Sequence, residues 1–267
     1  MSKPDDPITR AFIAEAMKVH SSIGPGLNEE IYHQELAERL SKAGMAHLSK
    51  PRRELIYRGV VADVFEPDLV VANHFIPELK CLRGKFAAPH LVQLFSYCKF
   101  WRLCTGFLVD FGKNSLLWKR YLYFSKTAPW PEESIPSFVI KLGLARDILR
   151  LVGECLAEMG LGYRETTWIG LVMAALQAGG LHVRQNPSAQ VLQFGLMGMP
   201  CIMVENTCAI LVTALSEEIT AADRAVLHTY LRWLNLDWGI NIHFGKSTVD
   251  VRFVSRPRNN PPTDNHS

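Results

Sequence analysis

Residues 67–80, PDLVVANHFIPELK, decide how this sequence is interpreted. Valine, leucine, isoleucine and phenylalanine dominate the stretch, which indicates buried strands, yet Asp68, Glu78 and Lys80 interrupt it. An unpaired charge is costly to bury, so charged side chains in such a place are usually paired, bound to a metal or part of a functional site. The question raised by the stretch is therefore what these three charges do.

The spacing of the charges favours metal chemistry. The stretch predicts two antiparallel strands with a tight turn at residues 72–74, so Asp68 and Glu78 can face each other near one end of a hairpin. Side chains two positions apart share a face of a strand, which places Glu78 and Lys80 on either side of the Leu79 carbonyl. Carboxylate and carbonyl oxygens are the ligands that Mg²⁺ or Mn²⁺ takes. An ammonium group beside the metal can orient a water or offset charge on a phosphoryl group, which suits phosphodiester hydrolysis.

The rest of the first half predicts an α/β layer. Apolar residues at helical spacing predict helices, and short apolar runs between turn residues predict strands. The expected order is helix 8–22, helix 28–44, a three-strand meander at 54–58, 62–71 and 74–82, helix 89–101, and strands 105–111 and 116–123. This order indicates helices that cover a mixed sheet.

The sequence also repeats itself. Residues 8–32 align with residues 144–168 at an offset of 136, and after a three-residue contraction the Phe-Gly-Lys of 111–113 recurs at 244–246, an offset of 133. We therefore expect two tandem copies of one fold. The expected boundaries are a first domain at 1–126, a Pro-rich linker at 127–143, a second domain at 144–255 and a disordered tail at 256–267.

Composition and charge limit the function classes. The chain has 267 residues, 48% of them apolar and 21% charged, which is typical of globular proteins. No apolar run approaches the roughly 18 residues of a membrane helix, and no signal peptide is evident. Six cysteines without a C-x-x-C pair favour reduced thiols, so we expect a cytoplasmic protein without membrane association. Residues 1–130 carry 18 Lys and Arg against 13 Asp and Glu, whereas residues 131–267 carry 11 against 13, so positive charge concentrates in the first half.

Four short motifs follow one another in a fixed order in the first half of the chain. They are Gly26-x-x-Glu29-x-x-Tyr32, Pro67-Asp68, Glu78-Leu79-Lys80 and Gln93-x-x-x-Tyr97. In this combination the chain resembles the PD-(D/E)XK nuclease superfamily and, within it, the GxxExxY family, over about residues 8–123. The resemblance implies an α/β fold with two tandem restriction-endonuclease-like domains, each a central mixed β-sheet flanked by helices.

The resemblance also implies roles for the motif residues. Asp68, Glu78 and the Leu79 carbonyl are expected to bind Mg²⁺ (or Mn²⁺), and Glu29 to join this set directly or through water. Lys80 is expected to be the catalytic lysine, with Gln93 supporting the lysine or the substrate. Tyr97 is expected to pack or hydrogen-bond nearby. The expected substrate-side residues are His90 and the basic residues Arg52, Arg53, Arg83 and Lys85, which suit contacts with phosphates.

The second copy lacks the motif residues that would carry the chemistry. Cys201, Leu211, Thr213 and Val226 stand at the positions of Asp68, Glu78, Lys80 and Gln93, and only Glu165 keeps the carboxylate of Glu29. One carboxylate without partners is not a site for a hard metal ion. We therefore expect residues 144–255 to fold like the first copy and to lack activity.

Plainer interpretations stay open for each motif. Asp68, Glu78 and Lys80 could form a structural ion pair, Glu29 could be a carboxylate favoured by a helix dipole, and Gln93 and Tyr97 could be a helix face under the sheet. His20, His33 and His74 are interpreted as surface histidines. The favoured function is a Mg²⁺-dependent nuclease acting on nucleic acid, DNA before RNA, with the two copies packed together. The alternatives are a non-catalytic nucleic-acid-binding module and a protein-interaction module that uses the second copy. No Gly-rich nucleotide loop occurs, so no coupled ATPase is expected.

Overall fold

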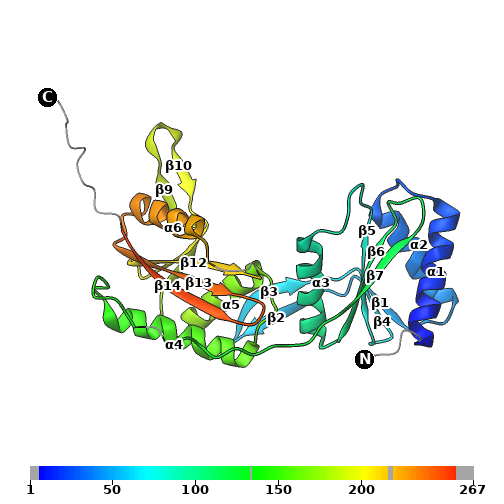
Figure 1. The fold of residues 1–267 in the computed structure, drawn as a ribbon, viewed down its shortest axis with the longest axis horizontal. Coiled ribbons are helices and arrows are strands. Elements are labelled where there is room, and N and C mark those ends of the chain that lie inside the picture. Colours follow the sequence, from blue (N-terminus) through cyan, green and yellow to red (C-terminus); the bar gives the residue numbers. More distant parts are fainter. Residues whose placement is uncertain (1–5, 133, 216–218, 257–267) are drawn as a thin grey trace. The chain divides into compact units, whose positions relative to one another are not determined.

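A computed structural model describes residues 6–132, 134–215 and 219–256 (Figure 1). Residues 257–267, which make up nearly all of the expected tail, lie outside the described part. The chain forms two compact units, each assembled from separate segments of the sequence. The first contains the described residues up to Leu55 together with Val64–Ser125 and Gly162–Arg164, and the second contains Ile56–Asp63, Lys126–Leu161 and the described residues from Glu165 onward.

Local caps define the helices of the first unit. The Asp6 carboxylate accepts hydrogen bonds from the backbone N–H groups of Ile8 and Thr9, which begins α1 (Pro7–Ile23), and Gly24, with φ of 75°, ends it. The Asn28 side chain accepts from the Glu30 N–H at 3.0 Å and begins α2 (Glu29–Lys42). The third helix, α3, spans Ala88–Trp101.

The strands of the first unit form a mixed sheet and two short ladders. In the mixed sheet, β5 (Ile76–Lys80) is parallel to β6 (Thr105–Asp110), which is antiparallel to β7 (Leu117–Leu122). The helix α3 connects the two parallel strands. The strands β1 (His47–Ser49) and β4 (Leu69–Val71) pair with each other, and β2 (Arg53–Tyr57) pairs with β3 (Val60–Phe65).

The expected three-strand meander is wrong at its middle strand. The sequence predicted one strand over 62–71, but the chain breaks between β3 and β4 at Glu66-Pro67-Asp68. Proline has no backbone N–H to donate to a ladder, which favours a break at this point. After the break, β4 pairs with β1 rather than continuing the β2–β3 hairpin. Asp68 is consequently placed in the bend before β4, not within a strand.

Two helical layers cover the mixed sheet of the first unit. Phe12 of α1 and Tyr32 of α2 are fully buried in one cluster with Leu79, Phe107 and Phe111. On β6, Gly106 lies against α3, because a Cβ atom at this glycine would come within 2.8 Å of the Leu94 side chain. Since Leu79 faces the α1–α2 layer, alternation along β5 turns Glu78 and Lys80 to the other face, the face of α3.

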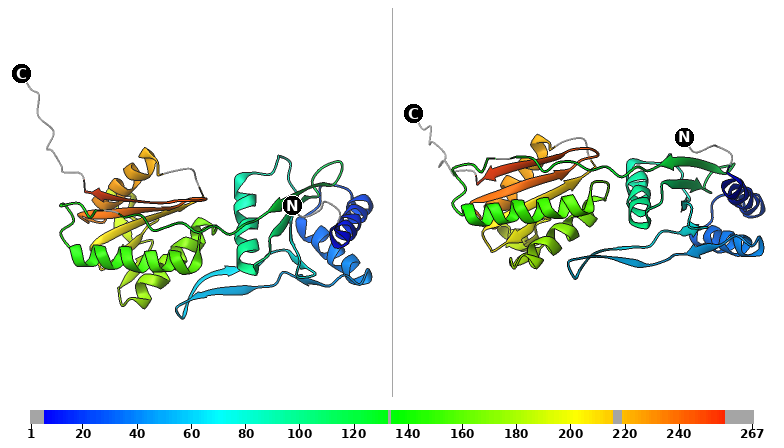
Figure 2. Two further views of the ribbon diagram at one scale, coloured as in Figure 1. Left: turned by 60° about the horizontal axis from the view of Figure 1, so that its bottom comes forward. Right: turned by 90° about the horizontal axis from the view of Figure 1, so that it is seen from below.

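The elements of the second unit are α4 (Leu142–Met159), α5 (Glu165–Ala178), β8 (Val183–Gln185), β9 (Ser188–Gln190), a 3-10 turn (Leu192–Phe194), β10 (Leu196–Gly198), β11 (Ile202–Val204), β12 (Cys208–Ala214), α6 (Ala221–Trp233), β13 (Trp238–Phe244) and β14 (Val249–Ser255). Five of the strands form one mixed sheet, in the order β14-β13-β12-β11-β8. The helices α4 and α5 cover one face and α6 covers the other (Figure 2). Trp168 of α5 stacks on Phe244 at a centroid distance of 3.7 Å on the first face, and Leu227 of α6 is buried with Ala209 on the second.

Mixed α/β structure is confirmed in both halves of the chain. Each half has a sheet with parallel and antiparallel strands, flanked by helices. All six cysteines lie in the described residues, and none is paired in a disulfide. Among the described helices, none is long and apolar enough to cross a membrane.

Candidate metal and phosphodiester site

Three acidic residues and one lysine of the motifs meet beside β5. Lys80 Nζ donates to Glu78 Oε1 at 2.9 Å, and the Leu79 N–H between them donates to Asp68 Oδ2 at 2.8 Å. Glu29, the first residue of α2, interacts electrostatically with Lys80 and Asp68 and accepts a hydrogen bond from the Cys81 backbone. Residues 29, 68, 78 and 80 therefore come together from three different elements.

Glu78 is the most constrained of these groups. It is only 3% exposed, and no other group in the described part of the chain hydrogen-bonds to its Oε2. Burial raises the pKa of Glu78 to about 7, and the nearby Asp68 carboxylate adds to the increase, while Lys80 opposes it. One oxygen of Glu78 is thus bonded by Lys80, and the buried Oε2 makes no full hydrogen bond, although the Asp68 backbone interacts with the carboxyl group and lowers its pKa slightly.

Glu29 and Lys80 are shifted by the same cluster. Burial raises the pKa of Glu29, Lys80 counteracts that increase, and Asp68 adds to it. Burial lowers the pKa of Lys80, but Glu78, Glu29 and Asp68 more than offset burial, so its pKa is raised overall. Lys80 is therefore charged at neutral pH, and its hydrogen bond to Glu78 holds it in place.

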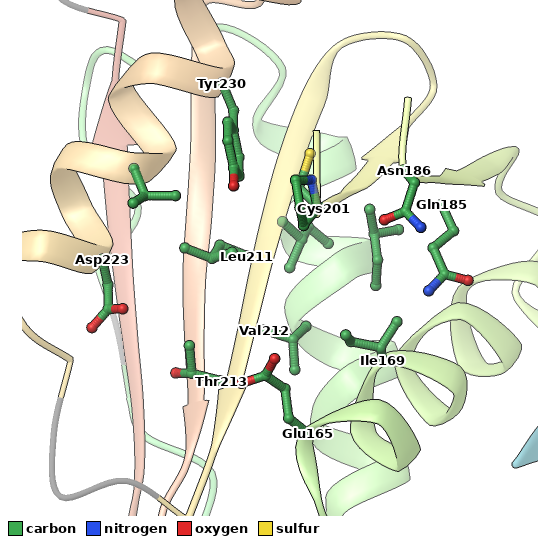
Figure 3. A pocket seen from close by; sticks show the side chains of 14 residues that line it. Glu165, Ile169, Gln185, Asn186, Cys201, Leu211, Val212, Thr213, Asp223 and Tyr230 are labelled. Atoms are coloured by element: carbon green, nitrogen blue, oxygen red, sulfur yellow. The ribbon is translucent and has the colours of Figure 1, made fainter. Parts of the chain in front are cut away.

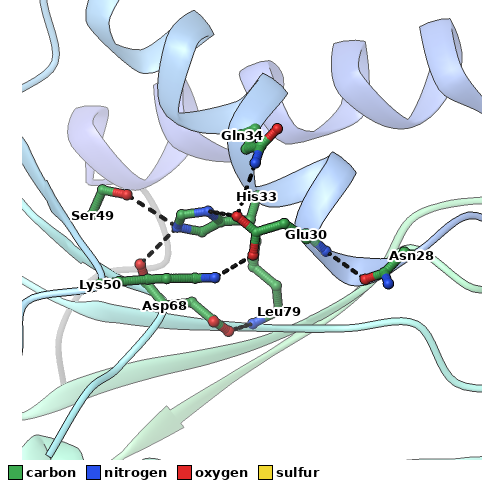
Figure 4. Close-up of polar contacts among 8 residues, drawn as sticks. All are labelled: Asn28, Glu30, His33, Gln34, Ser49, Lys50, Asp68 and Leu79. Atoms are coloured by element: carbon green, nitrogen blue, oxygen red, sulfur yellow. Dashed lines mark hydrogen bonds and ion pairs between the residues drawn. The ribbon is translucent and has the colours of Figure 1, made fainter.

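A network behind the site fixes Asp68 (Figure 4). His33 Nε2 donates to the Asp68 carbonyl oxygen at 3.0 Å and lies 3.2 Å from Ser49 Oγ, and the Lys50 N–H donates to the same carbonyl at 2.9 Å. The Lys50 ammonium in turn forms an ion pair with Glu30. These contacts hold the backbone of Asp68 while its carboxylate points toward Leu79.

The interpretation of His20 and His33 as surface histidines is wrong. His33 is 4% exposed because its ring bonds Asp68, and His20 is 7% exposed because its Nε2 lies 2.8 Å from the Lys113 carbonyl oxygen. The helical spacing of both residues indicates inward faces of α1 and α2, and this signal could have revealed their burial. His74 is exposed, as expected.

Gln93 and Tyr97 of α3 lie on the face of the sheet that carries Glu78 and Lys80. Gln93 was expected to support Lys80, but it bonds Tyr97 instead. Gln93 Nε2 donates to the Tyr97 hydroxyl at 3.1 Å, and that hydroxyl donates to the Glu66 carbonyl oxygen at 3.2 Å. Burial raises the pKa of Tyr97, and the charge of Glu78 adds to this increase, which indicates that the phenol is near the carboxylate. Among the described residues no hydrogen bond joins Gln93 to Lys80, so its support for the lysine remains a prediction.

The expected substrate-side residues are mostly at the surface. Arg52, Arg53, Arg83 and Lys85 are exposed, which leaves their charges accessible to a polyanion. His90 is half-buried at the start of α3, where its Nδ1 accepts the Ala87 N–H at 3.0 Å and caps the helix. The cap accounts for one ring nitrogen of His90 and leaves its substrate contact as a prediction.

The motifs did not include Asp110. This residue is fully buried at the end of β6, beside Lys80 in the β5–β6 register. Its Oδ1 accepts the N–H groups of Leu82 and Gly112, both at 2.9 Å, and Lys113 Nζ lies 3.6 Å from its Oδ2. Asp110 therefore positions the chain that leaves β5 just after Lys80. A carboxylate at the end of the apolar strand run is the signal that could have identified it.

The donor set fits a divalent cation in its chemistry. In the described part of the chain, no three His, Cys, Asp or Glu side chains form a cluster that could hold a metal ion as it stands. Glu78 Oε2 nevertheless lacks a partner, and Asp68 repels Glu78 and Glu29, so added positive charge would stabilise all three carboxylates. Hard oxygen donors with a charge deficit are what Mg²⁺ or Mn²⁺ requires.

Comparison with known proteins assigns the first half to a family. One solved structure, described as "Crystal structure of SSO0001", is similar to 44% of this chain over 79% of its own length, with 16% sequence identity and a TM-score of 0.27. No curated protein matches the chain. The sequence model described as PD-(D/E)XK nuclease superfamily matches residues 6–121. Residues 6–121 therefore form a domain of the PD-(D/E)XK nuclease superfamily.

Proposed function

We propose that the N-terminal domain is a Mg²⁺- or Mn²⁺-dependent nuclease that hydrolyses phosphodiester bonds of nucleic acid, with DNA favoured over RNA. The observation that carries the proposal is the buried Glu78, with one oxygen held by Lys80 and the other without a full hydrogen bond. A structural ion pair accounts for the first oxygen only. A cation bound at the second oxygen of Glu78 would supply the positive charge that this buried carboxylate lacks, which the ion pair with Lys80 alone does not do.

The roles follow from the placement of each group. Asp68, Glu78, Glu29 and the Leu79 carbonyl would hold the cation. When bound, such a cation polarises phosphoryl oxygens and lowers the pKa of a bound water. Lys80 stays charged because the surrounding carboxylates raise its pKa, so its ammonium can stabilise negative charge that develops on a phosphoryl oxygen. Gln93 and Tyr97 would hold the α3 side of the site, and His90 with Arg52, Arg53, Arg83 and Lys85 would contact the substrate.

A matched pair of lysine variants tests this proposal. Lys80→Met removes the ammonium inside the site, whereas Lys42→Met removes one that is exposed on α2. We expect Lys80→Met to lower the rate of DNA cleavage in Mg²⁺ on the order of 10²- to 10³-fold, because the lost charge acts at the transition state. Lys42→Met should cleave like the unmodified protein. Cleavage by Lys80→Met at the unmodified rate would contradict the proposal.

Calorimetric titration with Mg²⁺ and Mn²⁺ tests the cation site separately. Glu78→Gln keeps the shape of the side chain and removes its charge, so we expect it to weaken cation binding markedly. Glu38→Gln, on the exposed side of α2, serves as the control. Equal cation binding by both variants would contradict the assignment of Glu78 as a ligand.

We further propose that the domain belongs to the GxxExxY branch. The conformation of this motif supports the assignment. Gly26 has φ of 103°, a conformation that favours glycine, and Glu29 follows as the first residue of α2. The Tyr32 hydroxyl donates to the Gly24 carbonyl oxygen at 2.6 Å and accepts the Leu27 N–H at 3.1 Å. Tyr32 thus anchors the loop before Glu29. The three motif positions therefore act together to place the Glu29 carboxylate at the start of α2.

We also propose that residues 144–255 are a degenerate second copy of the fold, joined to 1–126 by the 127–143 linker. Backbone features support this proposal. The bounds of α5 are those of α2 displaced by 136 residues, and Gly24 and Gly26 have counterparts with positive φ at Gly160 and Gly162. Beyond the contraction, the positive-φ pair Ala72-Asn73 recurs at Glu205-Asn206, displaced by 133. The parallel partners Lys80 and Asp110 likewise correspond to the partners Thr213 and His243.

A further inference from the structure

The second unit contains a cavity of about 280 Å³ (Figure 3). Eight of its fourteen lining residues stand at positions that the proposed duplication matches to motif residues of the first unit. These eight are Glu165 for Glu29, Pro200 for Pro67, Cys201 for Asp68, Leu211 for Glu78, Val212 for Leu79, Thr213 for Lys80, Val226 for Gln93 and Tyr230 for Tyr97. The cavity therefore occupies the place in the second unit that the charged cluster occupies in the first.

The cavity forms where the ladder of the sheet stops. The strand β11 pairs with β12 only from Cys208 to Ile210, so residues 211–213 extend past its end. The start of α5 and the helix α6 flank this segment and contribute Glu165 and Tyr230. In the first unit the Asp68 carboxylate bonds the backbone at the corresponding edge, whereas Cys201 has a smaller and less polar side chain. Loss of the charged groups leaves a space with apolar walls.

The lining selects against anions. None of the fourteen lining residues is a lysine or an arginine. Four of them are buried and weakly polar or apolar, namely Cys201, Ile202, Ile210 and Val212. Glu165 is exposed as a whole residue, but its carboxyl group is partly buried. Partial burial raises the pKa of Glu165, and the charge of Asp223 adds to the increase. A phosphate would meet two carboxylates here, whereas a neutral group with N–H donors would relieve their repulsion.

Asn241 is buried next to this region but does not line the cavity. It lies beside Leu211 in the β12–β13 register, so both side chains are on the α6 face of the sheet. Asn241 is 2% exposed, and within the described ranges neither its amide nitrogen nor its amide oxygen has a hydrogen-bond partner. Buried amides are normally satisfied, so the unpartnered amide of Asn241 is a local cost in the sheet beside the cavity.

We propose that this cavity binds one unstacked nucleobase, a flat neutral ring with an N–H edge. The volume is near the lower limit of roughly 300 Å³ for small-molecule pockets, which suits one ring system rather than a large ligand. The faces of the ring would pack on Leu211, Val226 and Tyr230, and its N–H edge would donate to Glu165. Proteins that read single strands hold unstacked bases in this way, between apolar or aromatic walls and a few polar groups. The choice of a base over other rings rests on the proposed nuclease function of the first unit.

Nucleoside binding to the full chain tests the proposal. Adenosine, guanosine, cytidine, thymidine and inorganic phosphate would each be titrated into the Lys80→Met protein, which keeps the second unit intact. We expect at least one nucleoside to bind and phosphate not to bind at this site. Glu165→Gln should weaken the nucleoside by about tenfold, the loss of one charge-assisted hydrogen bond, and Asp147→Asn, an exposed carboxylate on α4, should not.

Leu211→Trp supplies an independent variant that fills the cavity without changing its charge. We expect this variant to abolish nucleoside binding. Absence of binding by every nucleoside, binding that both variants leave intact, or preference for an alkylammonium ion over every nucleoside would overturn the inference. These outcomes are separate from those of the nuclease proposal, because DNA cleavage is measured on the unmodified protein and not on Lys80→Met. Cleavage by the unmodified protein without nucleoside binding defeats only the cavity assignment, and nucleoside binding without cleavage by the unmodified protein defeats only the nuclease.

Discussion

At the scale of single residues, Glu78 gives the metal-free protein a specific pH dependence. Its pKa in the folded protein is about 7, above its ordinary value of 4.5, so the folded state binds more protons than the unfolded state between these values. The free energy of unfolding should therefore fall as pH rises from about 4.5 to about 7, by on the order of 1 to 3 kcal/mol. The raised pKa of Glu29 contributes in the same direction. Urea unfolding in the presence of a chelator at pH 5, 6, 7 and 8 measures this slope.

One further carboxyl group, Glu165, adds to this slope because partial burial raises its pKa, whereas the remaining shifted groups do not produce it. The raised pKa values of Lys80 and Tyr97 affect stability only at alkaline pH. The lowered pKa values of Glu30 and Glu154 act below their ordinary range and with the opposite sign. Glu78→Gln should consequently flatten the pH profile and make the chelated protein more stable at pH 8. An unchanged slope in this variant would show that Glu78 ionises normally.

The sequence predicted the identity of the charged residues better than their bonds. Glu78 and Lys80 were expected to share a face, because the two-residue period of a strand is geometric and local. The hydrogen bond between Lys80 and Glu78, and that of Asp68 with the Leu79 N–H, depend on side-chain rotamers, which a spacing pattern does not contain. Asp110 was missed as a site residue because its carboxylate accepts from backbone N–H groups, those of Leu82 and Gly112, which every residue type except proline offers.

At the scale of elements, Gly112 controls the strand end that carries Lys80. A Cβ atom at Gly112 would lie 2.6 Å from the backbone nitrogen and oxygen of Leu82, which Asp110 and Lys113 hold in place. We expect Gly112→Ala to lower the free energy of unfolding by about 1 to 3 kcal/mol, because rigid backbone must move. The displacement begins two residues after Lys80, so cation affinity should fall as well.

The matched control is Gly84→Ala. No atom lies within 4 Å of a Cβ placed at Gly84, and its backbone is not in the left-handed region. We expect this variant to stay within about 0.5 kcal/mol of the unmodified protein. Guanidinium unfolding and metal titration of the two variants make the comparison, and equal effects would show that the contact at Gly112 is easily accommodated.

Helices were predicted more accurately than strand pairing. The expected helices at 8–22 and 89–101 differ from α1 and α3 by one residue at most at each end, because Asp6, Gly24 and Pro89 mark those ends locally. The three-residue strand β1 was not predicted, and β4 was assigned to the wrong partner. Pairing between β1 and β4 joins residues 20 to 24 apart along the chain, and a strand of three residues is too short to show an alternating pattern.

At the scale of the whole molecule, the division into units cannot be read from the linker. The prolines at 127–137 predicted a boundary there, but the second unit also contains Ile56–Asp63, far earlier in the sequence. In that unit, Arg58 forms ion pairs with Glu154 at 3.1 Å and Glu158 at 2.8 Å. The Asp63 carboxylate accepts a hydrogen bond from the Thr167 hydroxyl. A linker pattern records where the chain is extended, and it contains no information about which hairpin packs on which helix.

The unit boundaries lead to a prediction about a fragment. A chain of residues 1–126 retains Ile56–Asp63 but lacks α4 and α5, including Gly170, where even a Cβ atom would come within 1.8 Å of the Ala62 carbonyl oxygen. We expect the β2–β3 hairpin of this fragment to lose protection from amide exchange by at least about tenfold relative to the full chain, because its packing surface is absent. The amides of β5 and β6 should lose less, since their partners lie within the fragment. Equal protection of the hairpin in fragment and full chain would show instead that residues 1–126 are a self-contained domain.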